Sequence, residues 1–306
     1  MRPTLQRMRA ELTDLVELVL LPGLAAVLPW TLCFRVFRYA SRWRFLYRHE
    51  CEAALAGAVR HGWAGDPVAW IRHHRLMRLI DHADLYLSRT RGDGWMDRHL
   101  QVEGTWPDAG AAAVLCTFHW GAGMWGLRHA RSSGLSAHAL IAPVPVEQFR
   151  ARWVRLRYIL ARYDAVRRAL GHSPLDVSAS LRPALRALRG GEQVLAAIDV
   201  PADQVSASKE IEFLGLRARV PRGLLRVAAE QGVPVTVYLT GFRMQDGRRV
   251  LRIHRLPVCK DPDTLVEDVF VWLEQAIREE PSAWHFWAIS ERFLVERPRG
   301  TDAGSA

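Results

Sequence analysis

The sequence predicts an α/β protein with a mostly parallel central sheet and helices on both faces. Five short runs rich in apolar and β-branched residues occur between positions 111 and 257, and amphipathic helical patterns separate most of them. Strands that alternate with helices of this length are typical of parallel sheets covered on both sides. Hydrophobic residues make up 49% and charged residues 24% of 306 positions, which excludes disordered, collagen-like and coiled-coil chains.

The expected strands are recognised by their apolar content. They cover residues 111–118, 136–144, 192–200, 233–242 and 249–257. The first and third runs are apolar throughout, as is typical of central strands in a parallel sheet. Chemistry in such sheets gathers at the carboxyl ends of the strands, so we look there for functional side chains.

Apolar residues at helical spacing predict the helices between these strands. The patterns cover about 147–170, 180–188, 221–231 and 261–279, and a polar-rich helical region precedes the first strand over about 45–100. The pair Gly190-Gly191 and Gly232 stand where two of these helices are expected to end.

The N-terminal stretch Leu15 to Phe34 is about as long as a membrane-spanning helix. Glu17, Pro22 and Pro29 interrupt it, and arginines flank both of its ends, whereas a spanning helix has one positive side. We therefore expect a helical segment that lies in the interface of an anionic membrane, with a buried core hairpin as the alternative. The expected organisation is a membrane-associated segment over 1–45, an α/β domain over 46–296 and a disordered tail over 297–306.

The charge balance indicates the kind of partner. The formal net charge is +10, the isoelectric point is about 10.2, and Lys209 and Lys260 are the only lysines. Such a surface attracts phosphates, anionic lipids or acidic proteins. The arginines are dispersed and no recognition-helix or RNA-binding pattern occurs, which argues against nucleic acid. The four cysteines lack zinc-ligand spacing, so we expect a reducing compartment and no metal.

Two expected strands deliver polar side chains to the carboxyl edge of the sheet. The first leads to His119, followed by a turn of small residues, and the third leads to Asp199 and then Asp203. If the strands are neighbours, these side chains share a cleft. A structural histidine and a capping aspartate are the alternatives.

Six sequence blocks extend, in order, over nearly the whole chain. They are the apolar N-terminal segment, VEG at 102–104, the histidine turn at 117–125, GEQVLAAID at 191–199, FLGLRARVPRGLLRVAAEQGVPVTVYL at 213–239 and PSAWHFWAISERF at 281–293. In this order and spacing the chain resembles the bacterial lipid A late acyltransferases, a branch of the lysophospholipid acyltransferase-like superfamily.

The resemblance implies a glycerolipid acyltransferase-like fold and an acyltransferase activity. A fatty or polyketide-type acyl group would pass from an acyl carrier protein or coenzyme A thioester, as co-substrate, to a hydroxyl or amine of a lipid or glycolipid acceptor. The implied location is the cytoplasmic face of the bacterial inner membrane, as a peripheral or monotopic protein. No other cofactor is implied.

The family motif His-x4-Asp/Glu is only half present. His119 matches the histidine, which implies a general base, but Met124 stands at the acidic position. Three alternatives remain: Asp199 or Asp203 orients the histidine, a backbone carbonyl or water does so, or the chain is catalytically impaired and binds lipid or carrier protein in a biosynthetic complex. The missing acid favours a specialised acceptor, such as a pigment or polyketide lipid.

Further residues are assigned to substrate binding. Gly121 and Gly123 are available to expose backbone N–H groups to an oxyanion, with a purely structural tight turn as the alternative. The resemblance also implies an arginine that binds a headgroup phosphate, and other arginines flank the FLG block. These candidates are Arg167, Arg168, Arg217, Arg219 and Arg222, with a solvated surface as the alternative reading.

Overall fold

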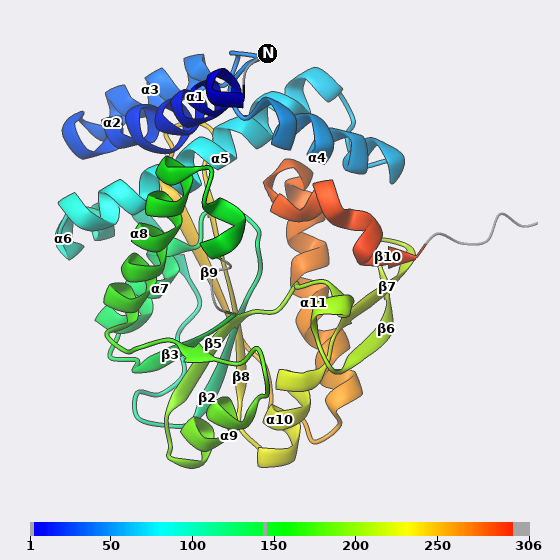
Figure 1. Cartoon of the computed structure of the whole chain (residues 1–306). Coiled ribbons are helices and arrows are strands. Elements are labelled where there is room, and N and C mark those ends of the chain that lie inside the picture. Colours follow the sequence, from blue (N-terminus) through cyan, green and yellow to red (C-terminus); the bar gives the residue numbers. More distant parts are fainter. Residues whose placement is uncertain (1–2, 143–145, 296–306) are drawn as a thin grey trace, which may run out of the picture.

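The chain folds around a seven-stranded sheet, as expected from its alternating strand and helix patterns. A computed structural model describes residues 3–142 and 146–295. The strand order is β1-β9-β8-β2-β5-β3-β4, and all neighbours are parallel except β8 and β9 (Figure 1). The strands are β1 (Leu100–Glu103), β2 (Ala113–Thr117), β3 (Ala137–Ile141), β4 (Leu175–Asp176), β5 (Gln193–Ala197), β8 (Val235–Phe242) and β9 (Arg249–Arg255).

A smaller antiparallel sheet lies beside this sheet. Its strands, in the order β10-β7-β6, are β6 (Ser208–Phe213), β7 (Leu216–Pro221) and β10 (Leu294–Val295). A tight turn at Leu214 and Gly215, both with positive φ, joins β6 to β7. The C-terminal part of the described chain therefore returns to pair with the middle of the sequence.

Helices cover both faces of the large sheet. The helices are α1 (Pro3–Asp14), α2 (Leu21–Val27), α3 (Trp30–Ala40), α4 (Arg48–Arg60), α5 (Pro67–Thr90), α6 (Asp93–Arg98), α7 (Met124–Ser132), α8 (Trp153–Leu170), α9 (Arg182–Arg189), α10 (Gly223–Gln231) and α11 (Pro262–Glu279). One hydrophobic core joins the sheet to α5, α7 and α8, and the other joins it to α9, α10 and α11.

The period of two along the central strands separates these cores. Val114 and Cys116 of β2 point into the core with α9 to α11, whereas Leu115 between them points into the other. Both faces are therefore buried, which explains why β2 and β5 are apolar throughout.

The structure differs from the expectations at several elements. The edge strand β1 and the hairpin of β6 and β7 were not expected, because their polar residues alternate with few apolar ones. The helix expected from residue 147 begins at Trp153 instead. The carboxylate of Glu11 from α1 accepts hydrogen bonds from the amides of Trp153 and Val154, and it thereby caps that start.

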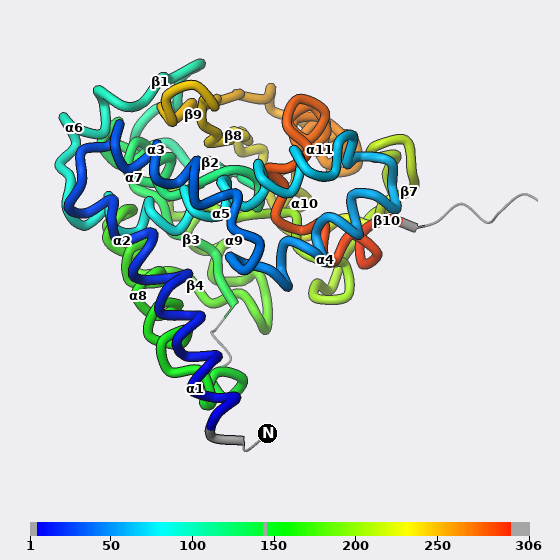
Figure 2. Tube along the Cα trace, turned by 90° about the horizontal axis from the view of Figure 1, so that it is seen from above, coloured from blue at the N-terminus to red at the C-terminus, as the bar shows by residue number. Residues whose placement is uncertain are grey.

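The N-terminal helices pack on the sheet domain. A π-helical turn, Leu15–Leu20, joins α1 to α2, and Figure 2 shows α1 lying along α8. Leu21, Cys33 and Phe37 belong to the same core as α5 and α7, so the expected segment 1–45 shares its core with the expected domain 46–296. No helix within residues 3–142 and 146–295 has the length and apolarity needed to cross a bilayer. The expected tail 297–306 lies outside the described residues.

Candidate functional site

Two neighbouring strands bring His119 and Asp199 to the same edge of the sheet. Strands β2 and β5 are parallel neighbours, and their register pairs Thr117 with Ala197. Each polar residue follows its strand by two positions, so the two side chains leave the sheet side by side. The predicted proximity of the two side chains thus arises from register and burial, because both strands are fixed by cores on both faces. Asp199 is buried, however, and does not line the cavity of His119.

The carboxylate of Asp199 is buried and fully occupied by hydrogen bonds. Its side chain is 1% exposed. It accepts bonds from the backbone amide of His119 at 2.9 Å and from Nδ1 of the same ring at 2.8 Å. The indole Nε1 of Trp284 donates to its other oxygen at 3.0 Å. These donors stabilise a charge that burial would otherwise make costly.

His119 is held on one side and open on the other. Its ring stacks on Phe286, with 4.3 Å between ring centroids, and its side chain remains 41% exposed. Because Nδ1 meets a carboxylate, the proton of the neutral ring resides on Nδ1 and Nε2 carries the free lone pair. The ring therefore presents a base with a fixed tautomer.

The turn after His119 is shaped by Gly121. Its φ is +73°, and a Cβ at this position would lie 2.1 Å from the carbonyl oxygen of Thr240. The amide of Gly121 donates to the carbonyl of Ala283 at 2.9 Å. The prediction that Gly121 offers its N–H to an oxyanion is therefore wrong, because the C-terminal segment already uses that donor. Gly123 lines the cavity beside His119 and directly precedes α7.

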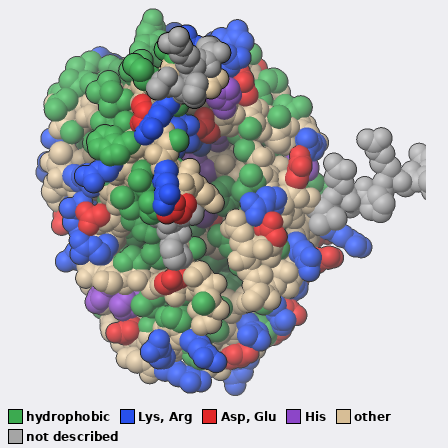
Figure 3. All heavy atoms as spheres, viewed as in Figure 1, with side chains coloured by type: hydrophobic (Ala, Val, Ile, Leu, Met, Phe, Trp, Pro, Cys, Tyr) green, Lys and Arg blue, Asp and Glu red, His purple; other side chains and the backbone are tan. Residues whose placement is uncertain are grey.

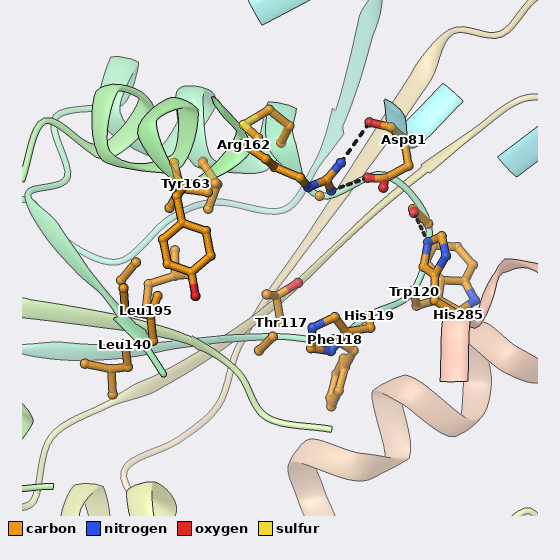
Figure 4. Close-up of a pocket in the computed structure, with 18 of the residues that line it drawn as sticks. Asp81, Thr117, Phe118, His119, Trp120, Leu140, Arg162, Tyr163, Leu195 and His285 are labelled. Atoms are coloured by element: carbon orange, nitrogen blue, oxygen red, sulfur yellow. Dashed lines mark hydrogen bonds and ion pairs between the residues drawn. The ribbon is translucent and has the colours of Figure 1, made fainter. Parts of the chain in front are cut away.

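His119 lies in the wall of a cavity of about 570 Å³. One side of the cavity is apolar, and Figure 4 shows Leu140, Leu195 and Tyr163 gathered there. Met124 and Leu127 of α7 also line the cavity. A cavity with an apolar side of this kind suits a hydrocarbon chain.

The other side of the cavity is polar and cationic. Asp81 and the guanidinium of Arg162 form an ion pair at 2.7 Å, and His285 lies toward the same side (Figure 4). Burial opposes ionisation of Asp81, but the nearby positive charges, Arg162 above all, hold its pKa below the ordinary value. Burial lowers the pKa of His285 and of its neighbour His82, so both are neutral at pH 7.

The structure separates the two acids considered as partners of His119. Asp199 makes the contact, whereas Asp203 pairs with Arg292 at 2.6 Å on the surface. Met124, at the motif's acidic position, is buried and lines the cavity. The assignment of Asp203 as a substitute acid is therefore wrong.

The arginine expected to face the site is on the right helix but in the wrong register. Arg167 and Arg168 are exposed on α8 and pair with Asp164 of the same helix. A helix advances 100° per residue, so Arg162 and Val166 share the face that lines the cavity, and the two predicted arginines face elsewhere.

The arginines beside the FLG block lie on the small sheet. Arg217 and Arg219 are exposed on β7, where they stand opposite Glu212 and Glu210 of β6. Arg222 pairs with Asp263 at 2.7 Å. None of the three lines the cavity of His119, so they belong to the protein surface, which was the alternative to substrate binding.

The sequence reasoning missed several residues of the site, Arg78, Arg162 and Trp284 among them. Arg78 and Arg162 line the cavity, and Trp284 holds Asp199. The block PSAWHFW contains Trp284 and carried a signal through its density of aromatic residues, but the two arginines look like any other arginine of an amphipathic helix.

Fold and site together define a three-layer α/β protein with a histidine–aspartate pair at the carboxyl edge of its sheet, beside a cavity with an apolar and a cationic side. The chain matches no protein-family model and no curated protein sequence. Within the described residues, no cluster of three or more His, Cys, Asp or Glu side chains is placed to hold a metal ion.

Proposed function

We propose that this protein is an acyltransferase that uses His119 as a general base to acylate a hydroxyl of a lipid acceptor. The observation that carries the proposal is the 2.8 Å hydrogen bond between Nδ1 of His119 and Asp199 at the wall of a half-apolar cavity. A buried carboxylate that orients an exposed imidazole is the arrangement that general-base catalysis requires. The sequence blocks that resemble the lipid A late acyltransferases support the same activity.

The chemistry follows from the fixed tautomer of the ring. Nε2 of His119 takes the proton of the acceptor hydroxyl while the oxygen attacks the carbonyl carbon of an acyl thioester. The C–O bond forms and the tetrahedral intermediate then loses the thiolate, which recovers the proton from the imidazolium. Asp199 stabilises the transient positive charge on the ring and stays ionised throughout.

The acyl chain belongs on the apolar side of the cavity, against β3, α7 and β5. Met124 contributes to that wall, which is compatible with a methionine at the motif position because Asp199 already orients the histidine. The donor would be a thioester of acyl carrier protein or coenzyme A.

The developing oxyanion needs donors other than Gly121. The first turn of an α-helix has backbone N–H groups without intrahelical acceptors. The first turn of α7 begins at Met124, directly after Gly123 at the cavity wall. These amides are the donors we assign to the oxyanion, and the positive end of the helix dipole acts in the same direction.

Attachment to an anionic membrane surface is part of the proposal. The N-terminal helices bury one face in the core but leave large apolar side chains outside. These are Leu5, Met8, Leu12, Leu20, Val27, Leu32, Tyr39 and Phe45. Figure 3 shows hydrophobic side chains gathered over α1 and α2. Exposed arginines at 35, 38, 42 and 44 adjoin this surface and would attract anionic headgroups.

A turnover assay tests the activity. Protein is mixed with a long-chain acyl–acyl carrier protein and a bacterial lipid extract, free thiol is measured over time, and new acyl lipids are identified by mass spectrometry. We expect thiol release coupled to one acylated lipid class, and loss of both in His119→Ala. A protein that binds the thioester without turnover would instead be a non-catalytic binding partner, and the proposal would be wrong.

Vesicle sedimentation tests the membrane surface. Deleting residues 1–45 is unsuitable because it would remove core residues such as Phe37, so exposed positions are changed instead. Leu20→Ser with Val27→Ser should weaken binding to anionic vesicles, whereas Val271→Ser, at an exposed position of α11, should not. Equal binding by both variants would place the membrane contact elsewhere.

A further inference from the structure

His285 is a second histidine of the cavity, and the acyl-transfer mechanism does not use it. It follows Trp284 in the C-terminal segment and lines the same cavity as His119. Its backbone amide donates to the carbonyl of His119 at 2.8 Å, so the backbones of the two histidines are held beside each other. Figure 4 shows its side chain on the side of the cavity away from Leu140 and Leu195. Two imidazole side chains therefore border the space in which acyl transfer would occur.

The tautomer of His285 is opposite to that of His119. Nε2 of His285 lies 2.7 Å from the carbonyl oxygen of Gly121, which can only accept, so Nε2 carries the ring proton. Burial is the main cause that lowers the pKa of His285, so the ring is neutral at pH 7 and Nδ1 keeps its lone pair. In His119 the proton is on Nδ1 and the lone pair is on Nε2. Each ring thus contributes one hydrogen-bond acceptor, through a different nitrogen.

Nδ1 of His285 is left without a donor by the protein. Within residues 3–142 and 146–295, no group comes within hydrogen-bond distance of this atom. It is not sealed inside the protein, in contrast to Nε2 of His82, which is both buried and unpartnered. The side chain as a whole is partly exposed and lines the cavity. An unpaired acceptor that opens to a cavity is a position where a ligand can supply the donor.

His285 lacks the partner that makes His119 a base. Asp199 accepts from Nδ1 of His119, whereas in the described part of the chain no carboxylate comes within ion-pair distance of His285. Burial disfavours its imidazolium most, and the charge of Arg78 acts in the same direction, although Asp81 opposes them. Its lone pair can therefore accept a hydrogen bond without holding the proton. The cavity thus offers one basic nitrogen and one nitrogen that only accepts.

We propose that His285 binds a second hydroxyl of the acceptor, so that the protein selects acceptors that carry two hydroxyl groups. The inference rests on the proposed acyl transfer. One hydroxyl donates to Nε2 of His119 and is acylated, while the other donates to Nδ1 of His285, stays free and orients the molecule. A site built to pair with a substrate hydroxyl rejects the analogue that lacks it, because a polar group of the site is then left unpaired.

Binding measurements on the full-length protein test this role without requiring turnover. The probes are dodecanol and its 1,2-diol and 1,3-diol, which share one chain length and differ in the second hydroxyl. We expect wild-type protein to bind one of the diols at least about tenfold more tightly than dodecanol, measured by isothermal titration calorimetry. His285→Phe should lose that preference. His119→Ala should lose it too, because one acceptor then remains for two hydroxyl groups.

His74→Phe is the matched control. His74 is also a neutral histidine bonded to a carbonyl of the C-terminal segment, with 2.8 Å between its Nδ1 and the oxygen of Ser282, but it does not line the cavity. This variant should keep the preference for the diol. Because the readout is a ratio between two probes, a general loss of packing at His285 would not by itself change it.

Several results would overturn the inference. They are a wild-type protein that prefers neither diol, a folded His285→Phe that keeps the preference, or a folded His74→Phe that loses it equally. His285→Leu, which also lacks an acceptor, replaces the phenylalanine variant if that one does not fold. A protein that prefers the diol but releases no thiol in the turnover assay would refute the acyl transfer alone. A protein that transfers acyl groups without this preference would refute the role of His285 alone.

Discussion

Asp84 and Asp199 are both buried aspartates, and the pairs that they form with a basic side chain serve different ends. Asp84 meets Arg249, and both side chains are 0% exposed. Nε of Arg249 lies 3.2 Å from Asp84, its Nη1 donates to the carbonyl of Gly247, and the rings of Trp30 and Trp125 sandwich the guanidinium. This pair ties β9 to α3, α5 and α7.

Asp199 is equally buried, but its partner is not. The side chain of His119 is 41% exposed and lies in a cavity wall. The aspartate is the same chemical group in both places, so the access of its partner decides what the pair does. A closed pair fixes the packing of four elements, whereas a half-open pair leaves one ring nitrogen for chemistry.

The largest effect is expected from Asp199→Asn. The asparagine amide cannot stabilise the imidazolium, and it favours the wrong tautomer of His119. The same change in a Ser-His-Asp catalytic triad lowers turnover by about 10⁴-fold. We expect acyl transfer to fall by about 10³- to 10⁴-fold, measured as thiol release. Asp203→Asn, which changes a surface pair, should leave the rate unchanged. A rate within tenfold of wild type in Asp199→Asn would show that the half-open pair is structural, like the closed one.

Arg249→Met should produce the largest loss of stability. It leaves the carboxylate of Asp84 buried without a partner, which typically costs about 3–5 kcal/mol. Urea denaturation measures the free energy of unfolding. Arg222→Met breaks a partly exposed pair and should cost about 1 kcal/mol or less. Asp84→Leu combined with Arg249→Met should recover much of the loss, and a double variant less stable than the single one would contradict this account.

Glu17 is a buried acid that, unlike Asp84 and Asp199, has no basic side chain within ion-pair distance in the described chain. Its ionisation therefore makes the stability of the fold depend on pH. Burial raises its pKa from about 4.5 to about 7, and Glu50 acts in the same direction. The folded protein therefore holds this proton more tightly than the unfolded chain, so the free energy of unfolding falls as pH rises from about 4.5 to about 7.

Glu17→Gln should remove that fall and raise stability at pH 8 by up to about 3 kcal/mol relative to wild type. The measurement is thermal and urea unfolding from pH 5 to pH 8. Glu11→Gln is a control of opposite sign, because the hydrogen bond from the amide of Val154 lowers the pKa of Glu11 against a small opposing effect of burial. Parallel pH profiles for wild type and Glu17→Gln would show that Glu17 is ionised without penalty.

The smallest effect is expected from Trp284→Phe. It removes the indole donor from Asp199 and leaves the other bonds of that carboxylate in place. We expect kcat/KM to fall by about tenfold, as for one hydrogen bond to a charged group, with a shifted pH profile. Trp287→Phe is the matched control, since its Nε1 donates to the carbonyl of Pro281 instead. An equal fall and equal shift in both variants would assign the effect to packing.

The part of the fold that the sequence predicted is the part buried on both sides. Strands β2 and β5 are apolar because two cores require it, and their ends therefore pointed to His119 and Asp199. The edge strand β1 and the hairpin of β6 and β7 carry Glu, Lys and Arg on an exposed face, which gives a weak signal. Local patterns identify strands by burial and miss those that lie at an edge.

The rest of the site depends on packing that the sequence does not display. Trp284 stands 85 positions from the carboxylate it holds. Whether Arg162 or Arg167 faces the cavity depends on the rotation of α8 about its axis. An error of one residue in the position of the helix changes the predicted direction of a side chain by 100°. The amide of Gly121 looked free because the carbonyl of Ala283 is distant in the sequence.

The hydrogen bonds from the C-terminal segment to the site have a consequence for biosynthesis. Residues 283–285 supply the acceptor for the Gly121 amide, the indole for Asp199 and an amide donor to the carbonyl of His119. These residues leave the ribosome long after both strands of the site have emerged. The nascent chain therefore carries the histidine turn without these three hydrogen bonds until residues 283–285 have been synthesised.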